Sequence, residues 1–328
     1  FVFLEISSLS SYVLIGIGRD RRALTAAYQY LIMGTIGATF ILIGIGLLYA
    51  MTGTLNMGDL AARIPAVAHT RTVHAAFAFL AIGVSLKLAL FPLHLWLPNA
   101  YAYAPSAVTA FLAATATKVA VYVLLRFFFT VFGAPFSFGT MRLDIVLLPL
   151  ALAGIFSASV AAIFQADVKR MLAYSSVAQV GYMILGISLV SVTGLTAGIS
   201  HLFNHALMKG ALFMALGCVS FRVGAAKLER MAGVGRTMPW TMGAFVIGGL
   251  SLIGVPLTAG FVSKWYLVVG ALEKGWWPVA VLVLISSLLA VIYIWRVVEV
   301  AYFEPAPEGE AAGEAPLALL VPTWTLAL

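Results

Sequence analysis

The chain has 328 residues, of which 62% are hydrophobic and only 9% are charged, and its formal net charge is +7 at pH 7. This composition excludes a soluble globular protein and predicts an all-α polytopic membrane protein. The basic residues lie in short loops between apolar runs, where they set membrane orientation, so nucleic acid is not an expected partner.

Apolar runs long enough to cross a bilayer as helices recur along the whole chain. The expected spans are 1–17, 26–51, 73–97, 105–132, 145–164, 171–190, 193–221, 239–271, 278–303 and 315–328. We expect one transmembrane domain over 1–328, because no composition shift marks a soluble module. The first and last runs look truncated, so a fragment lacking the first helices and the C-terminal end is expected. The acidic segment 304–314 is expected to be a solvated loop.

Loop charges predict the orientation of these spans. Lys and Arg are more frequent in the loops of one side, and that side is expected to be cytoplasmic. The richer side has Arg19, Arg21, Arg22, Lys169, Arg170, Arg222, Lys227, Arg230, Arg236 and Arg296, and the poorer side has Arg63, Arg71, Arg126, Arg142 and Lys274.

Two apolar runs combine a helix-breaking proline with a lysine. Lys87 and Pro92 both lie within GVSLKLALFPLHLWLP, and Pro256 interrupts a later run just before Lys264. A proline removes a backbone donor, so the freed carbonyl must face protein or water rather than lipid. An ammonium group inside hydrocarbon costs roughly 3 kcal/mol or more unless it faces the protein interior. The pattern predicts two interrupted transmembrane helices, which point to a transporter built from repeats.

Seven ionisable residues lie inside expected spans, where no loop explains them: Glu5, Lys87, Lys118, His201, His205, Lys209 and Lys264. Intramembrane charges of this kind are usually functional. Several serines follow Glu5, so its helix has a polar side that cannot face lipid, and we expect Glu5 to pair with Lys87. A purely structural salt bridge is the alternative. Lys118 lies too deep to reach the interface easily, and an interior amine is suited to losing and regaining a proton.

The segment HLFNHALMKG places His201, His205 and Lys209 at positions i, i+4 and i+8, on one face of one helix. Histidine can change its charge near pH 7, so this face is a candidate proton relay through intervening water. Satisfied core histidines are the alternative. A metal site is not expected, because no nearby Cys, Asp or Glu completes a ligand set. His94, just after Pro92, is assigned to the same aqueous path.

The segments FPLHLWLPNAYAYAPSAVTAFLAA, QADVKRMLAYSSVAQVGYM, HLFNHALMKG and GVPLTAGFVSKWYL resemble the antiporter-like subunits shared by two assemblies. These are respiratory complex I (NADH-quinone oxidoreductase, in its L, M and N subunits) and the Mrp-type sodium/proton antiporters (in their A and D subunits). The resemblance implies two inverted repeats, each with an interrupted helix, and a line of Lys, Glu and His residues across the membrane centre.

The resemblance also implies roles for individual residues. Glu5 matches the family's glutamate, Lys118 its linking lysine, and Lys87 and Lys264 the lysines of the two interrupted helices. His201, His205 and Lys209 match the intervening relay. Lysine at both 118 and 264 resembles the D subunit of the Mrp type and the N subunit of complex I equally.

The sequence therefore predicts a proton-translocating membrane subunit with a Lys, Glu, His and water relay, coupled to electron transport or to cation exchange in a larger complex. Its expected partners are other membrane subunits, and its expected location is a prokaryotic plasma (inner) membrane. No cofactor is expected, because nucleotide motifs, haem ligand sets and cysteine clusters are missing from the sequence. Two alternatives stay open: the D subunit of an Mrp-type sodium/proton antiporter, and a structural membrane anchor that conducts nothing.

Overall fold

The computed structural model describes residues 1–18, 20–305 and 313–328. Arg19 and residues 306–312 of the expected acidic loop lie outside the described residues. The regular secondary structure of the described part is helical apart from one isolated β-bridge, between Asp167 and Lys227. The α-helices are α1 Val2–Gly16, α2 Arg21–Thr52, α3 Met57–Val67, α4 Arg71–Leu88, α5 Trp96–Tyr103, α6 Ser106–Leu125, α7 Leu143–Ile163, α8 Val168–Ser188, α9 Val192–Val223, α10 Val234–Thr237, α11 Pro239–Ile253, α12 Ala259–Glu273, α13 Trp277–Phe303 and α14 Leu317–Ala327. Two π-helical segments follow α6, η1 Arg126–Val131 and η2 Pro135–Thr140, and a 3-10 turn, η3 Leu228–Met231, precedes α10.

The protein is an all-α polytopic membrane protein, as predicted. In the described part, 7 helices are long and apolar enough to cross a membrane. Each predicted apolar run contains a helix. Two short helices were not predicted, α3 and α10. Helix α3 is amphipathic, and the side chain of Asn56 caps it by accepting from Gly58 N at 2.8 Å. It escaped prediction because an 11-residue helix is too short for a span.

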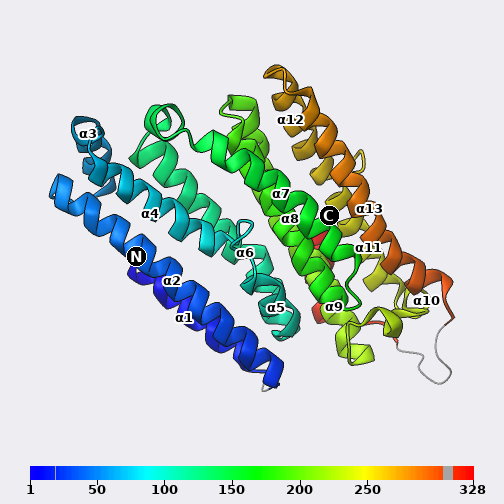
Figure 1. Ribbon diagram of the computed structural model, residues 1–328. Helices are drawn as coiled ribbons and strands as arrows, with labels where there is room; N and C mark the ends of the chain where they lie inside the picture. The colour runs from blue at the N-terminus through cyan, green and yellow to red at the C-terminus, as the bar shows by residue number, and fades with distance from the viewer. Residues whose placement is uncertain (19, 306–312) are drawn as a thin grey trace.

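Helix α8 lies at the centre of the molecule. It stands between a group formed by α1–α6 and a group formed by α11–α13, and α7 and α9 flank it (Figure 1). In an apolar 18-residue stretch of α8, 94% of the residues are buried, against 33% in the corresponding stretch of α2. Helix α8 is therefore enclosed by protein, while α2 lies at the periphery. Polar side chains of α8 therefore cannot reach lipid, and they must find partners inside the protein.

Small residues let neighbouring helices approach closely. A β-carbon on Gly83 of α4 would lie 2.7 Å from the carbonyl oxygen of Gly37 in α2, so only glycine fits there. The sequence pattern of small residues within spans indicated such contacts, and this one fixes α4 against α2. It also fixes the last turn of α4, which carries Lys87.

The chain leaves the helical conformation near both prolines. Helix α4 ends at Leu88, before Pro92, and α5 begins only at Trp96. Helix α11 ends at Ile253, before Pro256, and α12 begins at Ala259. Each break leaves carbonyl groups at a helix end without intrahelical partners. At the first break, Trp96 Nε1 donates to the Leu86 carbonyl at 3.0 Å.

Lys169 is buried, and this corrects its place among the predicted loop charges. The side chain is only 8% exposed, and its Nζ donates to the carbonyl of Ala104 at 2.7 Å, at the end of α5. Residue 169 lies in the first turn of α8, where the sequence suggested a solvated charge. The break after α4 brings α5 back against α8, and this burial could not be read from local sequence.

Candidate functional site

Glu5 and Lys87 meet between α1 and α4. Lys87 Nζ lies 3.0 Å from Glu5 Oε1 and donates to Ser8 Oγ at 2.8 Å. The Lys87 side chain is 7% exposed and that of Glu5 25%, so the pair is removed from lipid on the lysine side. Because Lys87 belongs to the last turn of α4, the ion pair is built onto the end of an interrupted helix.

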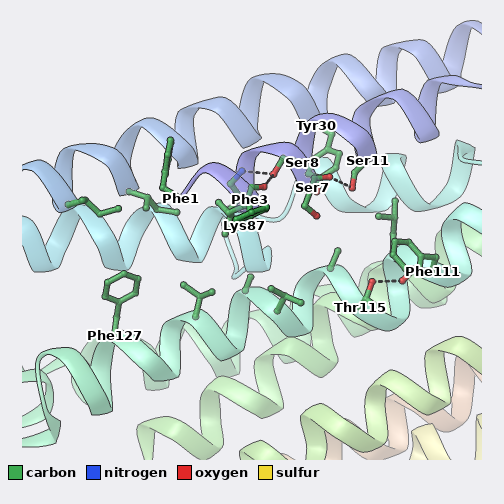
Figure 2. Close-up of a pocket in the computed structure, with 18 of the residues that line it drawn as sticks. Phe1, Phe3, Ser7, Ser8, Ser11, Tyr30, Lys87, Phe111, Thr115 and Phe127 are labelled. Atoms are coloured by element: carbon green, nitrogen blue, oxygen red, sulfur yellow. Dashed lines mark hydrogen bonds between the residues drawn. The ribbon is translucent and has the colours of Figure 1, made fainter. Parts of the chain in front are cut away.

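A cavity of about 530 Å³ adjoins this pair. Figure 2 shows hydroxyl groups of α1 and α6 around it, including Ser7, Ser8, Ser11 and Thr115, with Lys87 next to Ser8. Aromatic and aliphatic side chains make up the rest of the lining. The polar side that the sequence predicted for α1 thus faces this cavity, where hydroxyl groups can hold water next to the ion pair.

Aromatic rings connect the ion pair region to the first helix break. The ring centroids of Tyr12 and Tyr30 lie 4.8 Å apart, and the ring of Tyr30 stacks on Trp96 at 4.3 Å. Trp96 in turn binds the Leu86 carbonyl, one residue before Lys87. This stack holds the end of α4, and hence Lys87, against α1 and α2.

Lys118 lies on α6 where this helix packs against α9. Its side chain is 5% exposed, and Nζ donates to the carbonyl of Ala113 in its own helix. Lys118 therefore lies where the α1–α6 group meets the central helix α9.

The predicted face of α9 is fully buried. His201, His205 and Lys209 are each 0% exposed, and the two imidazole rings are stacked with centroids 6.1 Å apart. Lys209 Nζ donates to the Leu172 carbonyl at 2.8 Å and to the hydroxyl of Ser175 in α8. The spacing thus brings all three side chains into the protein interior, next to α8.

The two histidines differ in their hydrogen bonds. His201 Nδ1 lies 2.9 Å from Ser263 Oγ, and its Nε2 lies 2.8 Å from Gln179 Oε1. Both ring nitrogens of His205, in contrast, have no hydrogen-bond partner among the described residues. His201 fits the alternative of a satisfied core histidine, whereas His205 does not, because buried polar atoms are normally paired.

Lys264 lies beside the second helix break, in the second turn of α12. Its Nζ donates to the carbonyl groups of Leu252 at 3.1 Å and Ile253 at 2.8 Å and to Ser287 Oγ at 3.1 Å. Nζ also lies 4.8 Å from the centre of the Tyr182 ring. These carbonyl groups are free because α11 stops there, and they form the negative end of its dipole. Within the described ranges, no carboxylate lies within ion-pair distance of Lys264.

His94 stands apart from this network in its contacts. It is 8% exposed, its ring stacks on Phe91 with centroids 5.4 Å apart, and its Nδ1 has no partner in the described part of the chain.

Four side chains around the site were missed by the sequence analysis: Gln179, Ser263, Ser287 and Tyr182. Gln179 carried a usable signal, since an amide within an apolar span normally forms a hydrogen bond between helices. The serines resemble any small residue in a span.

Comparisons with known proteins agree on one family. The family model described as "NADH:quinone oxidoreductase/Mrp antiporter, TM" matches residues 1–290. The chain is 49% identical over 319 residues to the N subunit of the NADH-quinone oxidoreductase of Desulforudis audaxviator, an alignment covering 97% of this chain and 63% of the relative. It is 30% identical over 303 residues to the D subunit of the Na(+)/H(+) antiporter of Alkalihalophilus pseudofirmus, covering 92% of this chain and 61% of the relative. The chain thus spans about three-fifths of these relatives' length.

Solved structures give the same result at the level of the fold. A chain of the Mrp complex from Dietzia sp. superimposes with a TM-score of 0.90 and 29% identity, covering 99% of this chain and 68% of that chain. A chain of respiratory complex I from Thermus thermophilus gives a TM-score of 0.80 and 30% identity, covering 99% of this chain and 70% of that chain. Both neighbours come from multisubunit membrane complexes.

Proposed function

The chain belongs to the family of transmembrane subunits of NADH:quinone oxidoreductases and Mrp antiporters, and from this premise we propose that it translocates protons along its buried Glu, Lys and His side chains. One observation carries the proposal. Lys87 and Lys264 lie at the breaks of the two interrupted helices, and Lys118 and the buried α9 face with His201 and His205 lie between them. A structural anchor needs no buried row of titratable groups.

The Glu5 and Lys87 pair acts as the switch at one end of the proposed relay. While the pair is closed, Lys87 has a counter-charge 3.0 Å away. When the pair separates, the ammonium of Lys87 is left buried and unpaired, which is unfavourable. Its proton then moves inward, toward Lys118 and the α9 face. The cavity beside α1 supplies water for this step.

Internal water completes the relay. Packed helices lie about 8–10 Å apart, which is too far for every side chain to bond its neighbour directly. His205 has two buried nitrogens without partners among the described residues, and these are suited to bind bridging water. Lys264 receives the proton at the second break, where carbonyl oxygens and Ser287 stabilise its ammonium form.

We further propose that the protein acts within an NADH-quinone oxidoreductase-like complex in a prokaryotic plasma membrane. Support comes from the 49% identity to a bacterial N subunit of such an enzyme, against 30% for the D subunit of an antiporter. Other membrane subunits are its partners, and electron transport by further subunits drives it. An Mrp-type antiporter component is the second candidate, favoured by the TM-score of 0.90 to a chain of an Mrp complex.

Transport by the purified complex in sealed vesicles tests the proposal. Proton uptake that follows quinone reduction supports the respiratory function, and uptake driven by a sodium gradient supports the antiporter. Wild-type vesicles that move protons under neither condition, although the complex is intact, would leave only the structural anchor.

A further inference from the structure

The hydrogen bonds around His201 restrict where its protons can lie. Gln179 presents Oε1 to Nε2 at 2.8 Å, so this nitrogen carries a hydrogen. The proton that His201 gains and loses must therefore lie on Nδ1, the nitrogen that faces Ser263 Oγ at 2.9 Å. Gln179 is 1% exposed and Ser263 is 0% exposed, so bulk water cannot replace either partner.

Ser263 has two acceptors for its single hydroxyl proton. Its Oγ lies 3.1 Å from the Gly260 carbonyl oxygen and 2.9 Å from His201 Nδ1. When the ring is charged, Nδ1–H donates to Oγ, and the hydroxyl donates to Gly260. When the ring is neutral, the hydroxyl can turn and donate to Nδ1. Both charge states of His201 thus keep all their hydrogen bonds, with no rearrangement beyond one hydroxyl rotation.

The Gly260 carbonyl, to which this hydroxyl donates, lies in the same region as the Lys264 side chain. A β-carbon on Gly254 would lie 3.6 Å from Lys264 Cε and 3.7 Å from the Gly260 oxygen, so the two atoms are separated by no more than the sum of these distances. Ser263 and Lys264 are consecutive residues of α12, so their side chains leave the helix in different directions, and water must bridge the hydroxyl and the amine.

We propose that Ser263 is a proton-relay residue that connects His201 of α9 to Lys264 of α12, and that Gln179 is the positioning residue that directs the exchangeable proton to it. The inference rests on the proposed proton transport. In the forward step the Nδ1–H bond of the imidazolium breaks, and an Oγ–H bond forms on Ser263. The hydroxyl's original proton leaves Oγ and passes through intervening water to the neutral amine of Lys264, giving the ammonium. The hydroxyl is regenerated, and one proton has moved.

Ser263→Ala in the intact complex tests the relay role, with Ser188→Ala as the matched control. Both serines are 0% exposed and donate to the carbonyl three residues earlier in their helices, but of the two only Ser263 is hydrogen-bonded to a histidine. We expect Ser263→Ala to assemble normally and to lower proton transport about a hundredfold, the lower end of what a positioned proton carrier contributes. Ser263→Thr, which keeps the hydroxyl, should restore most of the rate, and Ser188→Ala should match the wild type.

Gln179→Met tests the positioning role. The thioether has nearly the same length but cannot accept from Nε2–H as the amide does, so the ring can place its lone pair on the side away from Ser263. Transport should fall about tenfold or more, the effect of leaving a buried donor unpaired, and the double variant with Ser263→Ala should be no slower than Ser263→Ala alone.

Three results would overturn the inference. An assembled Ser263→Ala complex with the wild-type rate excludes the relay role. Additive losses of transport in the double variant show that Gln179 does not act through Ser263. Failure of Ser263→Ala to assemble, when Ser188→Ala assembles, assigns Ser263 to structure instead. If wild-type vesicles move no protons at all, the proposed function fails first, and this outcome is distinguishable from the others.

Discussion

Lys87 and Lys264 are stabilised by different means, although both lie at interrupted helices. Lys87 has a carboxylate partner, Glu5, whereas Lys264 binds the carbonyl groups of Leu252 and Ile253 and the hydroxyl of Ser287. Carbonyl groups bind an ammonium group but leave its charge unneutralised, whereas a carboxylate binds it and also neutralises its charge. Substitutions at the two lysines should therefore give different results.

Lys264→Ala should lower proton transport by about a hundredfold or more while leaving assembly largely intact, because it removes the proton carrier at the second break. The carbonyl groups that it frees lie at a helix end, where water can satisfy them. Transport by reconstituted vesicles and the yield of intact complex are the measurements. Lys274→Ala is the control, since this lysine at the far end of α12 is exposed. Normal pumping by Lys264→Ala would remove this lysine from the relay.

Glu5→Gln should lower transport while the fold survives, because the amide cannot neutralise the buried Lys87. A static ion pair predicts another outcome: removal of one partner destabilises by about 3–5 kcal/mol, and the protein then assembles poorly. The double variant Glu5→Gln with Lys87→Met separates the two cases. For a switch, the double variant assembles but its transport stays lost. Pumping restored in the double variant would eliminate the switch.

The sequence identified the buried charges but not their surroundings. Glu5, Lys118 and the histidines of α9 were recognisable because a charge within an apolar run is costly and rare. Ser263 and Gln179 were missed as partners of His201, since hydrogen bonds between α8, α9 and α12 depend on helix rotation. Lys169 was misplaced for the same reason, because its burial arises from contact with α5, far away in the sequence.

At the scale of elements, the prolines located both interruptions, because a missing backbone donor is a local property. The positive φ of Gly254, 88° at the end of α11, was not part of that prediction. The lengths of the breaks were not predictable. Helix α5 continues to Tyr103, beyond the expected end at 97, because α8 and α2 pack against it. Tertiary packing rather than local propensity sets that boundary.

Gly260→Ala should disrupt the second interruption. A β-carbon at this position would overlap the carbonyl oxygen of Ser251, where α12 starts against the end of α11. We expect a loss of about 1–3 kcal/mol from overpacking, seen as a lower unfolding temperature of the purified complex, together with reduced transport. Gly46→Ala in α2 is the control, since nothing lies within 4 Å of its β-carbon. Equal unfolding temperatures for the two variants would contradict the proposed tight contact.

At the scale of the whole molecule, two connections are expected on opposite sides of the membrane. The α9–α11 connection, with Glu229, and the α12–α13 connection, with Lys274, are separated in the chain by one crossing, which α11 and α12 form. The loop charges predict that the α9–α11 connection is cytoplasmic. Cytoplasmic orientation is a property of the whole charge distribution, and it remains a prediction.

Cysteine labelling tests the orientation. Glu229 and Lys274 are exposed, whereas Cys218 is 1% exposed and should react slowly. In a background without other reactive cysteines, Glu229→Cys should react with a membrane-impermeant maleimide only in inverted vesicles, and Lys274→Cys only in intact cells. Labelling in the reverse pattern would show that the protein has the opposite orientation in the membrane.

The buried charges of the described chain are unequal in number: four lysines lie along the relay, and Glu5 is their only ion-paired carboxylate. Two ammonium groups about 10 Å apart repel by about 1.7 kcal/mol at an effective dielectric constant of about 20, which changes occupancy more than tenfold. Protonation of one lysine therefore disfavours protonation of the next. Protons should occupy the row in alternation, with negative cooperativity, so that each arrival at one end promotes a departure further along.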